Sequence, residues 1–224
     1  NVVGFTSFQN GKILEEVINR SKKLGFIVHP GVVLASRFGV PQRRNRLIAL
    51  AIRPDICRKV GITKETDILD IYPQGAIYEP TLFDGLNGVY VDPQERNYLL
   101  TSSIKSSLYE ILKAIPKNPG RPLGIGSVHP EWTSDFNMVR ASWKHPCPTL
   151  TQMGQRGGGG GIHHPDEDRV FTTNELKRLM GLPDDFHLTG TFNQKAERCG
   201  RMVTPQLYKH LARAIYQKVI LPSR

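Results

Sequence analysis

Three arginines stand close together in the sequence, at Arg43, Arg44 and Arg46. A planar guanidinium suits phosphate oxygens and the polar edge of a nucleic-acid base. The apolar residues 47–52 follow directly and are typical of a buried strand, most naturally in a parallel sheet. The arginines then lie where a strand begins, so rigid backbone can direct them at a ligand. A basic surface loop that leads into a core strand would give the same pattern.

The chain as a whole is basic. Its 224 residues contain 30 Lys and Arg against 20 Asp and Glu, a formal net charge of +10. This excess indicates a polyanionic partner, nucleic acid first and an anionic membrane surface second. No apolar run approaches the roughly 18 residues of a membrane span, and no signal-peptide pattern opens the sequence, so we expect a cytoplasmic protein.

The elements around the arginines follow an α/β rhythm. Apolar residues at helical spacing predict a helix over residues 11–24, which Gly25 ends. Residues 26–34 read as an extended segment, interrupted by Pro30-Gly31. We call residues 43–46 the arginine block. A helix and a strand before this block and a second strand after it together favour a parallel-sheet domain over residues 1–53.

The middle of the chain is less regular. Apolar spacing predicts a helix over residues 104–115, and residues 123–151 suit irregular β structure. Five consecutive glycines at 157–161 form either a flexible loop or a close approach to a ligand. The neighbouring Arg156 and histidines favour a loop ordered by DNA phosphates. A metal site at His163-His164 is not expected, because no third ligand stands at a recognisable spacing.

Two helices close the chain. Thr172 and Glu175 form a capping box before the first, and Thr204-Pro205 begins the second. We interpret both helices as scaffold.

Several segments resemble the signature blocks of the cytosine-C5 DNA methyltransferases, in the order the family uses. Residues 39–46, Gly-Val-Pro-Gln-Arg-Arg-Asn-Arg, match the block that precedes an apolar strand. Residues 168–186 and 198–205 resemble the last two blocks. Residues 148–151 resemble the end of the target-recognition region, and residues 1–2 the tail of a Glu-Asn-Val block.

The resemblance implies the C-terminal part of a Rossmann-like sheet that serves S-adenosylmethionine-dependent methyl transfer, plus a small irregular β-rich target-recognition domain. It divides the chain into part of the catalytic α/β domain (1–53), the target-recognition region (54–165) and closing helices that return to the catalytic domain (166–224).

The family's chemistry implies a role for Arg46. Such enzymes extrude a cytosine from the duplex. A cysteine thiolate adds to C6, a glutamic acid protonates N3, and C5 takes the methyl group of S-adenosylmethionine. Negative charge develops on the pyrimidine, so a fixed cation at O2 stabilises the transition state more than the ground state. By resemblance, Arg46 is that cation.

The same resemblance implies roles for other residues. Arg44 would hold a phosphate beside the extruded nucleotide, and Gln42 would hold the turn. Thr149 would press against a backbone phosphate of that nucleotide, and Asn1 would orient the glutamate expected before it. A fifth residue, Arg156, is expected to contact DNA.

The chain also departs from the family. The Phe-x-Gly-x-Gly cofactor segment, the Pro-Cys-Gln loop and the glutamate before residue 1 are absent from it. Cys147 does not replace the nucleophile, because it lies in the recognition region without a helix start that would lower its pKa. The last block implies cofactor contacts for Gly200, Arg201 and Val203, although the family often has asparagine in place of Arg201.

We therefore expect the C-terminal portion or subunit of a DNA (cytosine-5-)-methyltransferase of prokaryotic or phage type. Its partners would be double-stranded DNA and an N-terminal portion that binds most of the S-adenosylmethionine, and it would be inactive alone. The alternatives are an inactive DNA-binding or regulatory remnant of such an enzyme and an unrelated basic nucleic-acid-binding protein.

Overall fold

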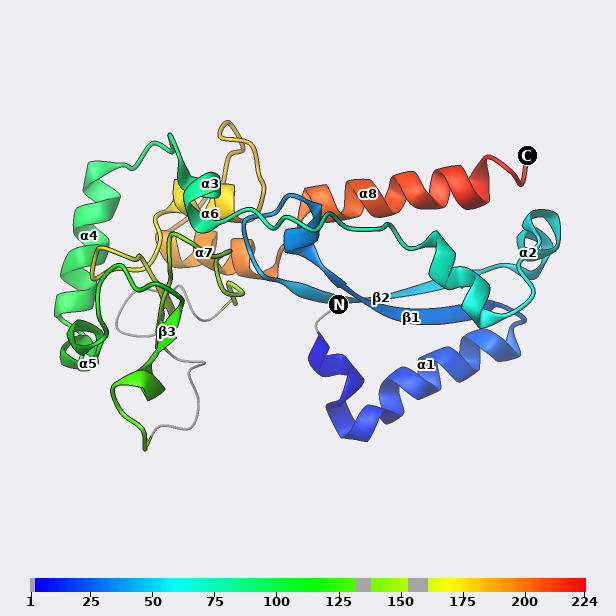
Figure 1. Cartoon of the computed structure of the whole chain (residues 1–224), viewed down its shortest axis with the longest axis horizontal. Helices are drawn as coiled ribbons and strands as arrows, with labels where there is room; N and C mark the ends of the chain where they lie inside the picture. Colours follow the sequence, from blue (N-terminus) through cyan, green and yellow to red (C-terminus); the bar gives the residue numbers. More distant parts are fainter. Residues whose placement is uncertain (1–2, 132–137, 153–160) are drawn as a thin grey trace.

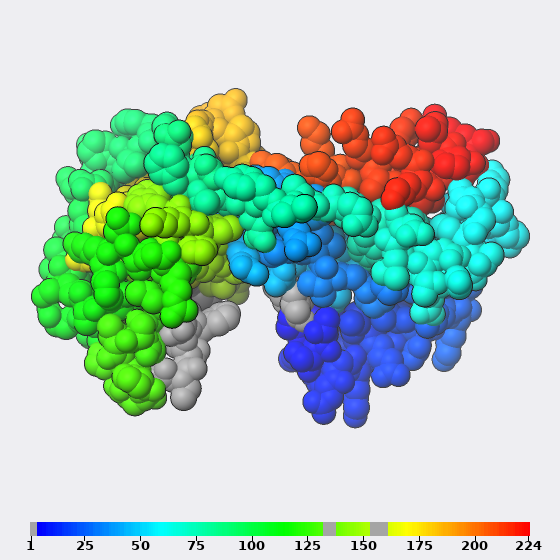
Figure 2. Space-filling view, in the orientation of Figure 1, coloured from blue at the N-terminus to red at the C-terminus, as the bar shows by residue number. Residues whose placement is uncertain are grey.

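The chain folds into two lobes that lie side by side along its longest axis (Figure 1 and Figure 2). The computed structural model describes residues 3–131, 138–152 and 161–224. In the first lobe, β1 (Ile27–Leu34) and β2 (Asn45–Ile52) lie between α1 (Lys12–Lys23) on one side and α8 (Pro205–Ile215) on the other. The same lobe contains α2 (Pro54–Val60) and the 3-10 helix η4 (Glu65–Ile71).

The two strands of this lobe are antiparallel, and their register runs from Ile27 opposite Ile52 to Leu34 opposite Asn45. The expected mixed α/β architecture is present, but the predicted parallel pairing is wrong. Residues 35–44 are too few for the crossover that parallel neighbours need. The apolar run in β2 also concealed an alternation, because Ala49 and Ala51 are exposed whereas Ile48 and Ile52 are buried.

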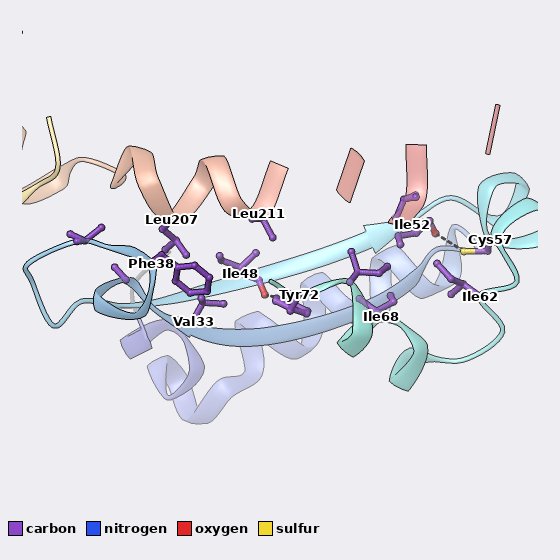
Figure 3. Close-up of a cluster of buried hydrophobic side chains, with 14 residues drawn as sticks. Val33, Phe38, Ile48, Ile52, Cys57, Ile62, Ile68, Tyr72, Leu207 and Leu211 are labelled. Carbon is purple, nitrogen blue, oxygen red and sulfur yellow. Dashed lines mark hydrogen bonds between the residues drawn. The ribbon is translucent and has the colours of Figure 1, made fainter. Parts of the chain in front are cut away.

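A hydrophobic cluster holds the first lobe together (Figure 3). Ile48 and Ile52 of β2 pack in it with Leu207 and Leu211 of α8. Burying such side chains stabilises the fold by roughly 1.5–3 kcal/mol each. Tyr72 lies in the middle of this cluster, and its hydroxyl donates to the carbonyl oxygen of Ile48 at 2.8 Å (Figure 3). The closing helix α8 therefore fixes the position of β2.

The second lobe is mainly helical, with a small three-stranded sheet. In that sheet β4 is antiparallel to β3 and parallel to β5. The elements of this lobe are α3 (Leu82–Leu86), α4 (Pro93–Ile104), α5 (Tyr109–Ala114), β3 (Leu123–Gly124), β4 (Met138–Arg140), β5 (Gly161–His163), α6 (Thr173–Leu179) and α7 (Phe192–Arg201).

Three features of this lobe differ from the sequence predictions. The single helix predicted over 104–115 is divided into α4 and α5, and between them the Ser106 hydroxyl accepts the N–H of Leu108 at 3.2 Å. The helix α7 was not predicted, although its Thr191 and Gln194 form a capping box. Finally, buried residues of α6 and α7 pack in the core of the second lobe, whereas those of α8 pack in the core of the first.

Candidate nucleic-acid interface

The arginine block lies where the two lobes join. Gln42 and Cys147 form a β-bridge. The N–H of Arg43 donates to the carbonyl oxygen of Cys147 at 2.8 Å, and the N–H of Cys147 donates to the carbonyl oxygen of Pro41 at 3.0 Å. This backbone pairing fastens the loop before β2 to the second lobe. The residues that precede Arg44 therefore cannot move independently of that lobe.

Gln42 is fully buried and ties the block to two further segments. Its Nε2 donates to the carbonyl oxygen of Leu179 at 3.1 Å, at the end of α6. Its Oε1 accepts the N–H of Leu150 at 3.1 Å. The side chain thus faces the protein interior, where its bonds hold the turn before β2, as expected for Gln42.

Arg44 is also buried, and its guanidinium binds backbone carbonyls. Its terminal nitrogens lie 2.7 Å from the carbonyl oxygen of Leu150, 2.7 Å from that of Gly200 and 3.0 Å from that of Met202. Burial, followed by the charge of Arg46, lowers its pKa to about 10, so it stays protonated at neutral pH. In this geometry the guanidinium joins the strand start to the second lobe, and the expected phosphate contact of Arg44 stays a prediction.

Arg46 lies on the face of β2 that α8 covers, and 9% of its surface is exposed. Its Nη1 donates to the carbonyl oxygen of Asn45 at 2.7 Å. Among the described residues, the side chain makes no other hydrogen bond. Burial lowers its pKa, whereas the nearby Tyr208 acts in the opposite direction. A charged group with unused donors is thus partly withdrawn from water.

A cavity of about 470 Å³ opens beside this guanidinium. That volume lies within the range of roughly 300–1,000 Å³ that is usual for ligand sites. No carboxylate lines it within the described part of the chain. The walls are formed by Arg44, Arg46, Thr149, Leu150, Thr151, Gln152, Gly200, Arg201, Val203 and Tyr208.

Several predicted residues therefore come together, and others do not. Thr149 reaches the cavity wall, where its hydroxyl donates to the carbonyl oxygen of Arg43 at 2.6 Å. Asn1 and Arg156 lie outside the described residues. The sequence reasoning missed Tyr208, although the helix start at Thr204-Pro205 places it in the first turns of α8.

Gly200 allows α7 to approach the cavity wall closely. A Cβ at this position would lie 2.4 Å from the backbone nitrogen of Gln152 and 2.4 Å from the carbonyl carbon of Thr151. The glycine is therefore explained by packing.

Gly200→Ala is expected to lower the free energy of unfolding by about 1–3 kcal/mol, because the backbone contacts cannot yield easily. Alanine favours a helix by up to about 1 kcal/mol, so a loss would report the clash and not helix propensity. Urea titration measures the change. Gly120→Ala, which meets open space, is the control. Equal stabilities of the two variants would show that the contact at α7 is not tight.

The cysteines have the properties of packed side chains. Burial raises the pKa of Cys147, which is fully buried, and raises that of Cys199 to about 11. A thiol that stays protonated is a poor nucleophile. The third cysteine, Cys57, is also buried, and burial raises its pKa as well.

A buried ion-pair network stabilises the second lobe. Arg169 makes two hydrogen bonds with Glu175, at 2.7 and 2.9 Å, and a third with Glu167 at 2.5 Å. Burial alone would raise the pKa of Glu175, but the bonds from Arg169 lower it overall. Glu175 also accepts the N–H of Thr172 at 2.7 Å and so begins α6, whose other end binds Gln42.

A model of the family described as C-5 cytosine-specific DNA methylase matches residues 1–217. The chain belongs to this family. Within the described residues, no helix is long and apolar enough to cross a membrane, and no group of three or more His, Cys, Asp or Glu side chains is placed to hold a metal ion.

The similar proteins include type II methyltransferases. The chain is 28% identical to M.NgoFVII of Neisseria gonorrhoeae, covering 100% of this chain and 61% of that protein. It is 25% identical to M.Sau96I of Staphylococcus aureus, covering 96% of this chain and 49% of that protein. The chain therefore spans about half to three-fifths of the length of these relatives.

Solved structures share the fold. A putative DNA modification methyltransferase encoded within a prophage of E. coli matches with a TM-score of 0.62 at 19% identity, over 97% of this chain and 67% of that one. The Dnmt2 methyltransferase of S. pombe matches with a TM-score of 0.56 at 17% identity, over 97% and 64%.

The family uses S-adenosylmethionine, and the cavity does not fit this cofactor. The cofactor carries a sulfonium and an ammonium against one carboxylate. Three arginines line the cavity, and the described lining residues include no acid that would balance them. The space beside the Cα of Gly200 is already occupied by the backbone of Thr151 and Gln152, so this glycine leaves no room for a cofactor group. The expected cofactor contacts of Gly200, Arg201 and Val203 are therefore not supported by this geometry.

Proposed function

We propose that this chain is the C-terminal portion of a DNA (cytosine-5-)-methyltransferase and supplies target recognition together with part of the pocket for an extruded cytosine. One observation carries the proposal. Arg46 stands at the start of a packed strand, with unused donors beside a cavity whose walls come from both lobes. A single nucleotide taken out of the duplex is the ligand that such a cavity suits.

Arg46 would act on the charge that develops in the reaction. When a nucleophile adds to the cytosine ring, negative charge spreads to O2, and a fixed guanidinium there lowers the barrier. Partial burial strengthens this interaction, because less water screens the charge. Rigid placement also matters, and the backbone bonds of Arg44 supply it from two residues away.

The nucleophile and the cofactor would come from a second portion. Cys57, Cys147 and Cys199 are all buried and burial raises the pKa of each thiol, which disfavours the thiolate, and the cavity does not suit S-adenosylmethionine. The relatives are longer than this chain, which agrees with a missing portion. That portion is either a separate subunit or another part of the same polypeptide.

The second lobe would read the DNA sequence. The net charge of +10 favours binding to a polyanion, and residues 149–152 connect this lobe to the cavity wall. We place the start of the recognition region after Tyr72, because Cys57, Ile68 and Tyr72 pack in the first lobe.

Mixing the chain with an N-terminal portion from the same source, labelled S-adenosylmethionine and duplex DNA tests the proposal. We expect label in DNA only when both portions are present. DNA binding by the chain without methyl transfer in any mixture would favour the regulatory remnant. Failure to bind duplex DNA at all would contradict both readings.

A further inference from the structure

The three arginines of the cavity differ in how much of each is free to bind a ligand. Arg44 is buried, and its terminal nitrogens already bind carbonyls. Arg46 is 9% exposed and lies deep in the wall. The side chain of Arg201, on the last turn of α7, is 65% exposed. Arg201 is therefore the lining guanidinium that solvent and a large ligand reach first.

The present partner of Arg201 holds it weakly. Its Nη1 lies 3.0 Å from Oε1 of Glu197, four residues earlier on the same helix. An exposed pair of this kind contributes only about 0.3–0.5 kcal/mol. A phosphate can form two parallel hydrogen bonds with a guanidinium, so it can displace the carboxylate at small cost.

We propose that Arg201 binds the DNA backbone phosphate next to the extruded nucleotide. This inference rests on the proposed function and assigns to Arg201 the phosphate contact that the resemblance implies for Arg44. The hydroxyl of Thr149 lines the same cavity and can take part, because it can donate to a phosphate in place of the carbonyl of Arg43.

A phosphate is favoured over the carboxylate of the cofactor. A DNA phosphate brings only negative charge to a site with three arginines. S-adenosylmethionine would bring two positive groups with its one carboxylate, and no described acid in the lining receives them. Arg201 would consequently affect DNA affinity and leave cofactor affinity unchanged.

Fluorescence anisotropy with a labelled duplex that contains one unpaired cytosine tests the assignment. We expect Arg201→Gln to raise Kd about tenfold and to reduce the salt slope by about one. The matched control is Arg198→Gln on the same helix, because Arg198 does not line the cavity and bonds to Thr189 instead. This control is expected to change Kd less than about twofold, as a distant charge does at 0.15 M salt.

Two further variants sharpen the result. Arg201→Lys is expected to recover part of the affinity, and Glu197→Gln to increase it by freeing the guanidinium. Equal losses for Arg201→Gln and Arg198→Gln would overturn the inference, since they would show a general charge effect. A loss of S-adenosylmethionine affinity confined to Arg201→Gln, measured by calorimetry on the two mixed portions, would also overturn it. If wild type binds no duplex DNA, the proposed function itself fails.

Discussion

Replacing Arg169 by methionine is expected to lower the free energy of unfolding by about 3–5 kcal/mol, because it leaves a buried carboxylate without its counter-charge. Glu175 is 2% exposed and would keep only the hydrogen bonds of its helix cap. The same change would loosen α6, whose last carbonyl oxygen, that of Leu179, accepts a hydrogen bond from Gln42. Loss of stability in the second lobe would therefore reach the arginine block.

Urea titration of Arg169→Met measures this effect. Arg20→Met is the control, because the pair of Arg20 with Glu16 is exposed and contributes little. The double variant Arg169→Met/Glu175→Leu is expected to recover much of the stability by removing both charges. A single variant that loses no more than the control would contradict the assigned importance of the network.

The pH dependence gives a second readout on Arg169→Met. In wild type the pKa of Glu175 is lowered, so its stabilising contribution is present above the unfolded value near 4.5 and is lost as pH falls. Without Arg169, burial dominates and raises this pKa. The stability difference between wild type and variant is therefore expected to shrink in two steps as pH falls. The variant first takes up its proton above pH 4.5, and wild type then loses its contribution below about pH 4.5 as its own carboxyl is protonated.

Arg46→Ala is expected to reduce methyl transfer by the reconstituted protein about 10²–10³-fold, the usual loss when one donor to a developing anion is removed. Duplex binding is expected to change little, because most affinity comes from phosphate contacts elsewhere. Single-turnover transfer of labelled methyl groups measures the first quantity, and anisotropy measures the second.

The neighbouring Arg43 offers the matched control for Arg46→Ala. Arg43 is exposed and does not line the cavity, so Arg43→Ala is expected to leave the rate of methyl transfer at saturating DNA unchanged. Comparable losses of binding and transfer in Arg46→Ala would assign this residue to general DNA binding.

Local patterns predicted the elements better than their pairing. The helix over residues 11–24 is confirmed as α1, and the caps at Thr172 and Thr204-Pro205 correctly begin α6 and α8. These signals depend on residues a few positions apart. The antiparallel pairing of β1 and β2 follows from their short connection. The continuous apolar composition of β2 pointed instead to a parallel strand.

The site showed the same limit. The arginine cluster predicted a functional position. However, the roles of the individual arginines differ because they depend on hydrogen-bond acceptors that lie far away in the sequence. Arg44 meets carbonyl oxygens 106, 156 and 158 positions later, and no short motif records such contacts. Arg46 differs because its guanidinium lines the cavity and, within the described part of the chain, donates only to the carbonyl oxygen of Asn45.

A structure of the chain with its complementary portion and duplex DNA would show whether Arg46 contacts the extruded base. We expect an extruded cytosine in the cavity, with its O2 about 2.7–3.2 Å from a nitrogen of Arg46. An Arg46 side chain that turns into an internal ion pair, while the extruded base occupies another site, would contradict it.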